Sequence, residues 1–287
     1  MGENDKRDAE ERSKILLEGR VSEGLYAYSD SMLIENKSAE GIKGTIIVSD
    51  VHLGYDYQYA DTGIRFLLKG DDSVYSKILQ LRKHYSNWLG IEADSIAFNG
   101  DIIDDFALKN VESRRSINLF FSRLSLKFRR VYLIRGNHDK MLDTLTLKDN
   151  CSISEYVILG HIIVMHGDRS IEELNAKDDM KKKGVNSIII GHEHPVLRLN
   201  DGIREEKYKC IVIFDDVHLG TLISRIYLMP AFNPNIEGTD IMQQSFMSPL
   251  LTNAMSKRTR ILVHDKNAGN VKGKFLDFGS VDDVKSL

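Results

Sequence analysis

Short runs of apolar, largely β-branched residues recur along the chain, and polar residues follow each run directly. This pattern is typical of buried strands that end in loops with reactive side chains. The runs lie at 45–48, 95–98, 131–134, 161–166 and 187–190. In open α/β sheets, ligands bind where the carboxyl ends of strands lead into loops. We therefore expect the functional residues of this chain in the loops that follow these runs.

Apolar residues at helical spacing separate some of the runs and predict helices over 74–90 and 111–128. The second helix is expected to bury an apolar stripe that consists of Leu119, Phe120, Leu124 and Phe128. A lysine-rich amphipathic helix is predicted over about 171–183, and a short exposed helix over 8–17.

The remaining strands are expected to pair largely as hairpins. An edge hairpin is predicted over 25–36, a second hairpin over 208–229 and two more strands over 260–278. One further strand is predicted at about 153–159. Strands that alternate with helices and are then followed by hairpins favour a mixed α/β sandwich over a simple doubly wound sheet.

The chain shows no low-complexity linker, so we predict a single domain over 1–287. Its core is expected over about 44–230. The remaining segments are an N-terminal helix and hairpin extension over 1–43 and a C-terminal segment over 231–287.

Composition narrows the class of protein. With 42% hydrophobic and 28% charged residues, the chain has the make-up of a soluble globular enzyme. A formal net charge of −3 does not imply attraction of the whole molecule to nucleic acid or to an anionic membrane. Two cysteines form no disulfide framework, and the sequence contains neither a signal peptide nor a membrane-spanning run. We expect a cytoplasmic protein without a membrane partner.

The residues that follow the apolar runs form a consistent chemical set. They are Asp50, His52, Asp101, Asn137, His138, His166, His192 and His194. Carboxylate, amide and imidazole without thiolate exclude a structural cysteine-type zinc site and favour a catalytic site for Mn, Fe or Zn. The set is larger than one ion needs. It suits two ions roughly 3.5–4 Å apart that share a bridging carboxylate.

Each motif alone has an ordinary structural explanation. Gly-Asp and Gly-Asn pairs such as Gly100-Asp101 and Gly136-Asn137 are most often turns, and His166 by itself would be a hydrogen-bonded histidine at a strand end. Turns do not require histidine, however, and histidine recurs in four of the five places. The combination therefore indicates one shared site.

Together the motifs resemble the signature of the calcineurin-like metallophosphoesterase superfamily. The matching blocks are Asp50-x-His52, Gly100-Asp101-x-x-Asp104, Gly136-Asn137-His138-Asp139, His166 and Gly191-His192-x-His194. Further on, 228–234 and 248–251 resemble a narrower branch, which holds the archaeal ICC-like predicted phosphoesterases and the bacterial phosphoesterases associated with DNA ligase or helicase. That branch implies DNA-repair proteins as partners.

The resemblance implies a four-layer α/β/β/α sandwich of two mixed β-sheets flanked by helices. It also implies a role for each matching residue. One metal ion is held by Asp50, His52, Asp101 and His194. The other ion is held by Asp101, Asn137, His166 and His192. His138 would protonate the leaving group or stabilise charge in the transition state, and Asp139 or Asp104 would orient an imidazole.

The implied function is hydrolysis of a phosphodiester, with a nucleotide or nucleic acid favoured as the substrate, by attack of a metal-bridging hydroxide. The cofactors are two divalent metal ions, with Mn favoured and Fe, Zn, Ni or Mg as alternatives. Other functions stay open: a phosphomonoesterase, a nucleotide pyrophosphohydrolase, or a binding module that keeps the fold without catalysis. The last usually lacks ligands or His138, whereas every position is filled here.

Other residues are open to two interpretations. Arg65 and Tyr55, in the loop after the first motif, are candidates to meet a substrate phosphate, although the sequence does not separate this role from a surface position. Phe232 and Asn233 either line the pocket or brace it. The basic stretches 114–130 and 177–183 are either strips for a nucleic-acid backbone or solvated helix faces, and the overall negative charge favours the second explanation.

One segment repeats the first motif. Residues 216–220 (Asp-Val-His-Leu-Gly) match 50–54 letter for letter. The repeat has no later partner motifs and lies between two strands of a predicted hairpin. We therefore expect it to be a coincidence in a hairpin loop rather than a second ligand pair.

Overall fold

The computed structural model describes ten stretches of the chain. They are residues 16–39, 41–55, 70–104, 107–109, 111–200, 204–220, 222–243, 245–252, 259–265 and 274–285. The predicted helix over 8–17 lies almost entirely outside these residues. Its last two positions belong to a strand, β1 (Leu16–Glu18), so the prediction is wrong there.

The first sheet has seven strands in the order β2-β3-β4-β5-β6-β7-β8. The strands β5 to β8 are parallel, and β2 to β5 pair antiparallel. Their bounds are Arg20–Ser22, Leu25–Tyr28, Ser31–Ser38, Gly41–Ser49, Glu92–Asn99, Arg130–Ile134 and Cys151–Ser154. The hairpin predicted over 25–36 is therefore confirmed as β3 and β4, but its predicted place at the edge of the sheet is wrong, because β2 pairs outside it.

The second sheet has ten strands, with a main path β1-β17-β16-β13-β14-β11-β10-β9 and β12 and β15 branching from β13. The strands β10, β11 and β14 are parallel, and most other pairs are antiparallel. The bounds of β9 to β17 are Tyr156–Leu159, Ile162–Met165, Ser187–Ile190, Pro195–Asn200, Glu205–Leu219, Leu222–Leu228, Thr239–Asp240, Thr259–His264 and Lys274–Asp277.

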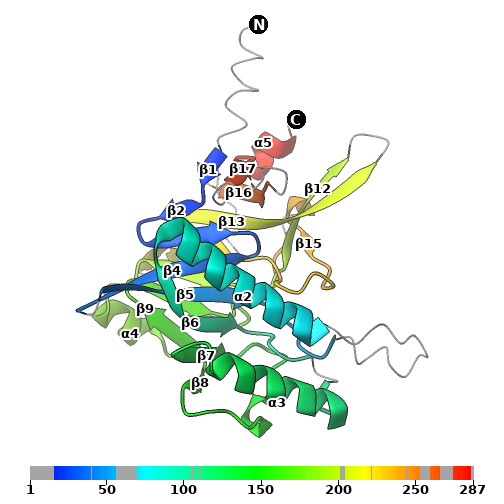
Figure 1. Cartoon of the computed structure of the whole chain (residues 1–287). Coiled ribbons are helices and arrows are strands. Elements are labelled where there is room, and N and C mark those ends of the chain that lie inside the picture. The colour runs from blue at the N-terminus through cyan, green and yellow to red at the C-terminus, as the bar shows by residue number, and fades with distance from the viewer. Residues whose placement is uncertain are drawn as a thin grey trace, which may run out of the picture.

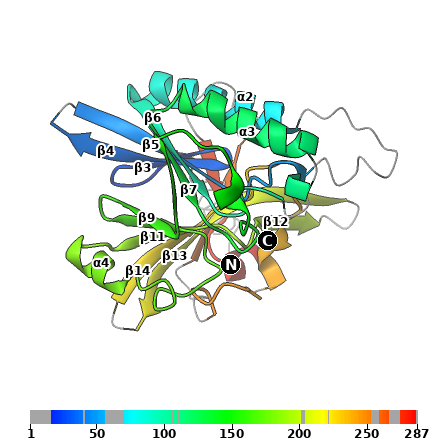
Figure 2. The ribbon, with the colours of Figure 1, turned by 90° about the horizontal axis from the view of Figure 1, so that it is seen from below.

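The helices cover the outer faces of the two sheets. Two long helices, α2 (Gly70–Leu89) and α3 (Val111–Ser125), lie side by side on the seven-stranded sheet, as Figures 1 and 2 show. Two short helices, α4 (Lys177–Lys182) and α5 (Val281–Lys285), pack on the ten-stranded sheet. Single 3₁₀ turns occur at Ala107–Lys109, Leu142–Thr144 and Ile241–Gln243. The predicted four-layer sandwich of two mixed sheets is confirmed.

Alternation along each strand assigns its side chains to different layers. In β5, Ile46 and Val48 face the long helices, whereas Ile47 packs between the sheets. In β11, Ile188 and Ile190 face outward toward the short helices, whereas the residue between them faces the other sheet. Both faces of these strands are thus buried, which explains why the sequence shows continuous apolar runs there rather than alternation.

The structure corrects three details of the predicted elements. The stretch 153–159 forms two strands, β8 and β9, which belong to different sheets and are separated only by Glu155. The lysine-rich helix is limited to α4, because 171–175 forms turns. On α3, Leu119 is 57% exposed, and the buried stripe contains Ile117 and Phe121 instead.

The described residues contain no helix that is long and apolar enough to cross a membrane.

We expect Phe98→Ala to lower the free energy of unfolding by about 3–5 kcal/mol, as is typical when a large core side chain is truncated. Phe98 is fully buried, and its ring meets the edges of Phe120 and Phe121 on α3. Urea denaturation measures the change. Leu119→Ala is the matched control and should change stability by no more than about 0.5 kcal/mol. Equal effects of the two substitutions would contradict this packing.

Candidate metal centre

The five loops that carry the predicted ligands meet where the two sheets come together. The parallel strands β5, β6 and β7 release three of the loops at one edge, and β10 and β11 release the other two. Backbone hydrogen bonds join neighbouring loops, from Asp50 N–H to Gly100 O at 3.2 Å and from Gly191 N–H to His166 O at 2.9 Å. The N–H of His192 donates to the carboxylate of Asp50 at 3.2 Å, which links one sheet to the other.

One cluster of potential ligand atoms contains Asp50, His52, Asp101 and His194. One donor atom from each residue lies within 4.8 Å of the other three. Oδ1 of Asp50 is 3.2 Å from Nε2 of His194, and Oδ2 of Asp101 is 4.0 Å from Nε2 of His52. The structure thus brings together all four residues that the resemblance assigns to the first ion.

A second cluster forms around Nε2 of His166. This nitrogen is 3.2 Å from Oδ1 of Asn137, 3.3 Å from Oδ1 of Asp101 and 3.2 Å from Nδ1 of His192. Ligand atoms bound at about 2.0–2.2 Å from one ion lie about 3 Å apart. The observed separations therefore match four ligands of one ion, and they include all four residues that the resemblance assigns to the second ion.

Asp101 belongs to both clusters. Its Oδ1 faces His166, whereas its Oδ2 lies toward His52. The side chain is almost completely buried at the end of β6. A single carboxylate thus presents one oxygen to each cluster, as a bridging ligand must.

Unpartnered buried atoms show that the first cluster fits a metal ion. Among the described residues, Nε2 of His52 and Nε2 of His194 are buried and make no hydrogen bond, although Nε2 of His194 approaches Asp50. Burial opposes a charge on His194, yet the carboxylate of Asp50 and, less strongly, the backbone of Glu237 raise the pKa of its imidazole. The side chain thus stands against a carboxylate that can share a cation with it.

The charge of the carboxylates in the two clusters also suits a cation. Burial alone would raise the pKa of Asp50 and Asp101, yet neighbouring imidazoles hold both below the ordinary range, with His194 acting mainly on Asp50 and His166 mainly on Asp101. The same carboxylates raise the pKa of His166 to about 9, against the opposite effect of burial. The centre therefore gathers ionised carboxylates that need positive charge beside them.

The backbone of the ligand loops is held in a sparsely populated conformation. Eight non-glycine residues of the described chain have positive φ, and five of them are predicted ligands: Asp50, His52, Asp101, His192 and His194. Such strain persists only where the surrounding structure over-determines it, and it clusters at functional sites.

Glycines beside the ligands provide space. A Cβ atom on Gly100 would overlap the ring of His166, and one on Gly136 would overlap Asp101. These glycines allow the strand-end backbones to lie directly against the ligand side chains.

His138 stands at the rim of the centre. Its N–H donates to Oδ1 of Asp101 at 3.1 Å, and its Nε2 is 4.0 Å from Oδ2 of Asp101. The imidazole is 43% exposed, whereas Asp50, His52, Asp101 and His166 are buried. It is therefore accessible to a substrate without being enclosed in either cluster.

Asp139 has three backbone partners. Its carboxylate accepts hydrogen bonds from the N–H groups of Ile102, Ile103 and Gly136 at 2.9, 3.2 and 2.9 Å. The orientation of an imidazole by Asp139 or Asp104 stays a prediction. Burial raises the pKa of Asp139 to about 7, and the backbone N–H groups oppose that rise. Asp139 thus ties the loop after β6 to the loop after β7, because three backbone donors converge on it.

The repeated motif lies outside both clusters. Asp216 and His218 belong to β13, where a bulge between Phe214 and Val217 shifts the pairing with β14. The positive φ of Asp216 accompanies that bulge. The repeat therefore lies in the strand itself, just before the hairpin turn, rather than in the turn as predicted.

The C-terminal segment braces the first ligand loop. Phe232 N–H donates to Ser49 O at 2.8 Å, and Nδ2 of the buried Asn233 donates to Val51 O at 3.0 Å. From α2, Lys77 donates to Phe232 O at 2.9 Å and lies over the ring of the same residue. Phe232 and Asn233 therefore hold the backbone around the first motif, which answers the alternative left open by the sequence.

The same segment also reaches the loops of the second sheet. Ser248 N–H donates to the carboxylate of Glu193 at 2.6 Å, and its hydroxyl donates to Gly167 O at 2.6 Å. Glu193 lies between two ligand histidines and is almost fully buried. These supports were missed at the level of sequence, and the only signal was the resemblance of 248–251 to a narrower branch.

The candidate substrate contacts receive no assignment from the structure. Tyr55 is half-buried, and its N–H donates to the carbonyl of His52 at 3.1 Å. Arg65 lies outside the described residues. Both remain predictions.

The basic stretch on α3 makes contacts within the protein. Arg114 donates to the carbonyl of Leu108 at 3.0 Å, and Arg123 pairs with Asp72 at 2.6 Å. Local contacts thus account for these side chains without a nucleic-acid backbone.

Asn233→Ala is expected to lower metal affinity by about 10–100-fold. The substitution removes the side-chain amide that donates a hydrogen bond to the carbonyl of Val51, which lies between the ligands Asp50 and His52. The substitution should also lower the free energy of unfolding by about 1–3 kcal/mol. Competition with a fluorescent chelator measures the affinity. Glu237→Ala is the control, because it removes an exposed side chain from the same segment and keeps the carbonyl. Unchanged affinity in Asn233→Ala would refute the bracing role.

Three solved structures align with this chain at low sequence identity. A nuclease, MPE, from Pseudomonas putida aligns with a TM-score of 0.52 and 17% identity, over 91% of this chain and 99% of its own. Vacuolar protein sorting 29 from Cryptosporidium parvum aligns with a TM-score of 0.34 and 12% identity, over 88% and 100%. A predicted phosphoesterase from Streptococcus pneumoniae aligns with a TM-score of 0.26 and 13% identity, over 77% and 82%. The likeness to the Pseudomonas putida structure concerns the fold alone.

No curated protein matches the sequence. A family model does: the calcineurin-like phosphoesterase model matches residues 45–218, which is more than half of the chain and contains both ligand clusters. The chain therefore belongs to the calcineurin-like phosphoesterase family.

Proposed function

We propose that this protein is a phosphodiesterase that works with two divalent metal ions. The observation that carries the proposal is the position of Asp101, whose two oxygens face two separate clusters of potential ligands. A single-ion site has no need of a carboxylate shared in this way.

In this proposal, each ion has four protein ligands. The ligands of one ion would be Asp50, His52, Asp101 and His194. The ligands of the other ion would be Asp101, Asn137, His166 and His192. Bound divalent ions would lower the pKa of water and neutralise charge on phosphoryl oxygens. Asn137 contributes a neutral oxygen, so it adds no negative charge to that of the carboxylates.

His138 is the residue we assign to the leaving group. Its imidazole lies at the rim of the centre and is 43% exposed, so it can reach an oxygen of a substrate that lies over both clusters. As a general acid, it would donate a proton to the departing oxygen. The hydrogen bond from its N–H to Asp101 fixes the backbone beneath it.

A nucleotide or nucleic acid is the substrate that we favour. The support comes from the Pseudomonas putida structure, whose protein is a nuclease and whose fold covers 91% of this chain. We favour Mn as the metal, because a mixed carboxylate, amide and imidazole set suits Mn, and Fe, Zn, Ni and Mg are the alternatives.

Metal binding is expected to stabilise the fold. Chelation should lower the melting temperature, and Mn at 100 times the dissociation constant should restore about 2.7 kcal/mol for each site. Metal analysis after dialysis should find two ions in the parent protein and fewer in Asp101→Asn. Asp216→Asn is the matched control, since Asp216 shares the positive φ of Asp101 but lies outside the clusters. One ion in the fully loaded parent would contradict the proposal.

Activity is expected to follow the metal. Chelated protein refilled with Mn, Mg, Zn or Ni should hydrolyse a chromogenic phosphodiester faster than the matching monoester. His138→Ala should lower kcat by about 10²–10⁴, the usual contribution of a general acid. Asp216→Asn should remain active. Preference for the monoester would indicate a phosphatase, and no turnover despite two bound ions would indicate a binding module.

A further inference from the structure

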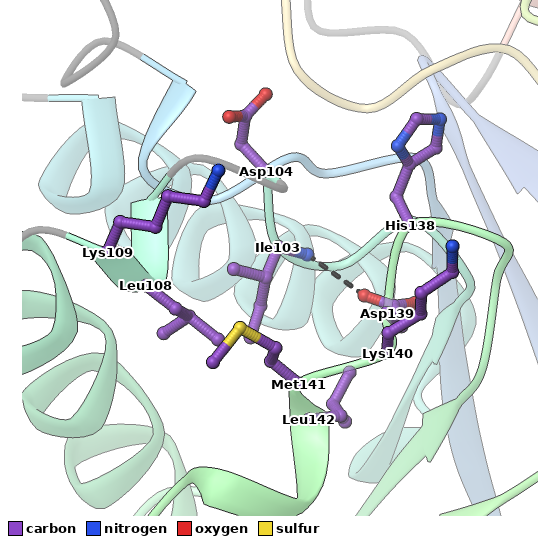
Figure 3. Close-up of a pocket in the computed structure, with 9 residues that line it drawn as sticks. All are labelled: Ile103, Asp104, Leu108, Lys109, His138, Asp139, Lys140, Met141 and Leu142. Atoms are coloured by element: carbon purple, nitrogen blue, oxygen red, sulfur yellow. Dashed lines mark hydrogen bonds between the residues drawn. The ribbon is translucent and has the colours of Figure 1, made fainter.

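A pocket adjoins the metal centre on the side of His138. It has a volume of about 310 Å³ and is open to the surface (Figure 3). That volume lies at the lower end of the range of about 300–1,000 Å³ for small-molecule sites. The residues that line it are Ile103, Asp104, Leu108, Lys109, His138, Asp139, Lys140, Met141 and Leu142.

The floor of the pocket is apolar. Ile103, Leu108 and Leu142 are buried, whereas Met141 is 38% exposed and lies between the latter two in Figure 3. A thioether side chain adapts to flat rings and makes favourable contacts with them. The hydrogen bond from Ile103 N–H to Asp139 at 3.2 Å fixes this floor to the ligand loops.

The rim of the pocket carries charge. Figure 3 shows Lys109 and Lys140 on opposite sides of the floor, with His138 above it beside Lys140. Ammonium groups attract phosphate, and Asp104 on the rim offsets part of their charge. An apolar surface between two ammonium groups matches a flat base whose sugar carries phosphates.

A second cavity on the other side of His138 differs in character. It has a volume of about 520 Å³, shares His138, Asp139 and Lys140 with the first pocket, and also contains Arg135 and Arg169. Both arginines pair with Glu155, and Arg135 also pairs with Asp143 at 2.6 Å. The two arginines are therefore paired within the protein, and the lining of this cavity contains no apolar floor.

We propose that the pocket formed by Leu108, Lys109, Lys140 and Met141 binds the nucleoside attached to the scissile phosphate, which makes a phosphodiester of a nucleoside the substrate class. This inference rests on the proposed phosphodiesterase function. His138 lines the pocket and also lies at the rim of the metal centre. Since we assign His138 to protonation of the leaving group, the nucleoside in the pocket is the one that carries the departing oxygen.

Calorimetry on Mn-loaded protein tests the pocket through binding. Thymidine 5′-monophosphate should bind at least about tenfold more tightly than inorganic phosphate, because the base gains contact with the floor. Met141→Glu and Lys140→Glu should remove most of this preference. Lys148→Glu is the charge-matched control, because Lys148 is exposed and lies outside the pocket, and the preference should persist in it.

A kinetic comparison separates this inference from the proposed function. The ratio of kcat/KM for a dinucleotide to kcat/KM for a chromogenic diester should fall about tenfold in Lys140→Glu and Met141→Glu, and stay constant in Lys148→Glu. Equal affinity for phosphate and the nucleotide, or a preference that survives both pocket variants, overturns the pocket alone. Absence of diester hydrolysis with every metal overturns the proposed function.

Discussion

The structure depends on electrostatic contacts between two buried carboxylates and the imidazoles beside them, at the place where the two sheets come together. Asp50 ends a strand of one sheet and accepts a hydrogen bond from His192 of the other. Asp101 faces histidines from both sheets. Ionised groups at this depth are costly unless opposite charge lies beside them. Three features keep these side chains in place. The backbone of the ligand loops adopts positive φ, glycines allow close approach, and the segment around Asn233 and Ser248 braces the loops.

The core of the centre was predictable because each ligand directly follows an apolar run. A run rich in Ile and Val indicates a buried strand, and parallel neighbours release their loops at one edge, so Asp50, Asp101 and His138 had to lie close together. The architecture was predictable for the same reason, since helices alternate with those runs. Local pattern and global fold agree over this part of the chain.

Long-range contacts were not predictable from local pattern. The stretch 153–159 reads as one strand, yet the chain passes from one sheet to the other at Glu155, and periodicity does not reveal which neighbour a strand will take. The buried stripe of α3 is rotated so that Leu119 faces outward, which tertiary packing decides. The hydrogen bonds from backbone N–H groups to Asp139 likewise join two loops that are distant in sequence, and no local pattern indicates them.

The bracing of both sets of loops by 232–248 affects the order of assembly. Ribosomal synthesis proceeds from the N-terminus, so the last ligand, His194, is synthesised well before Asn233 and Ser248. The nascent chain therefore holds every ligand while Val51 and Glu193 still lack the partners that fix them. The loops that carry these two residues gain the braces only after the chain has been synthesised as far as Ser248.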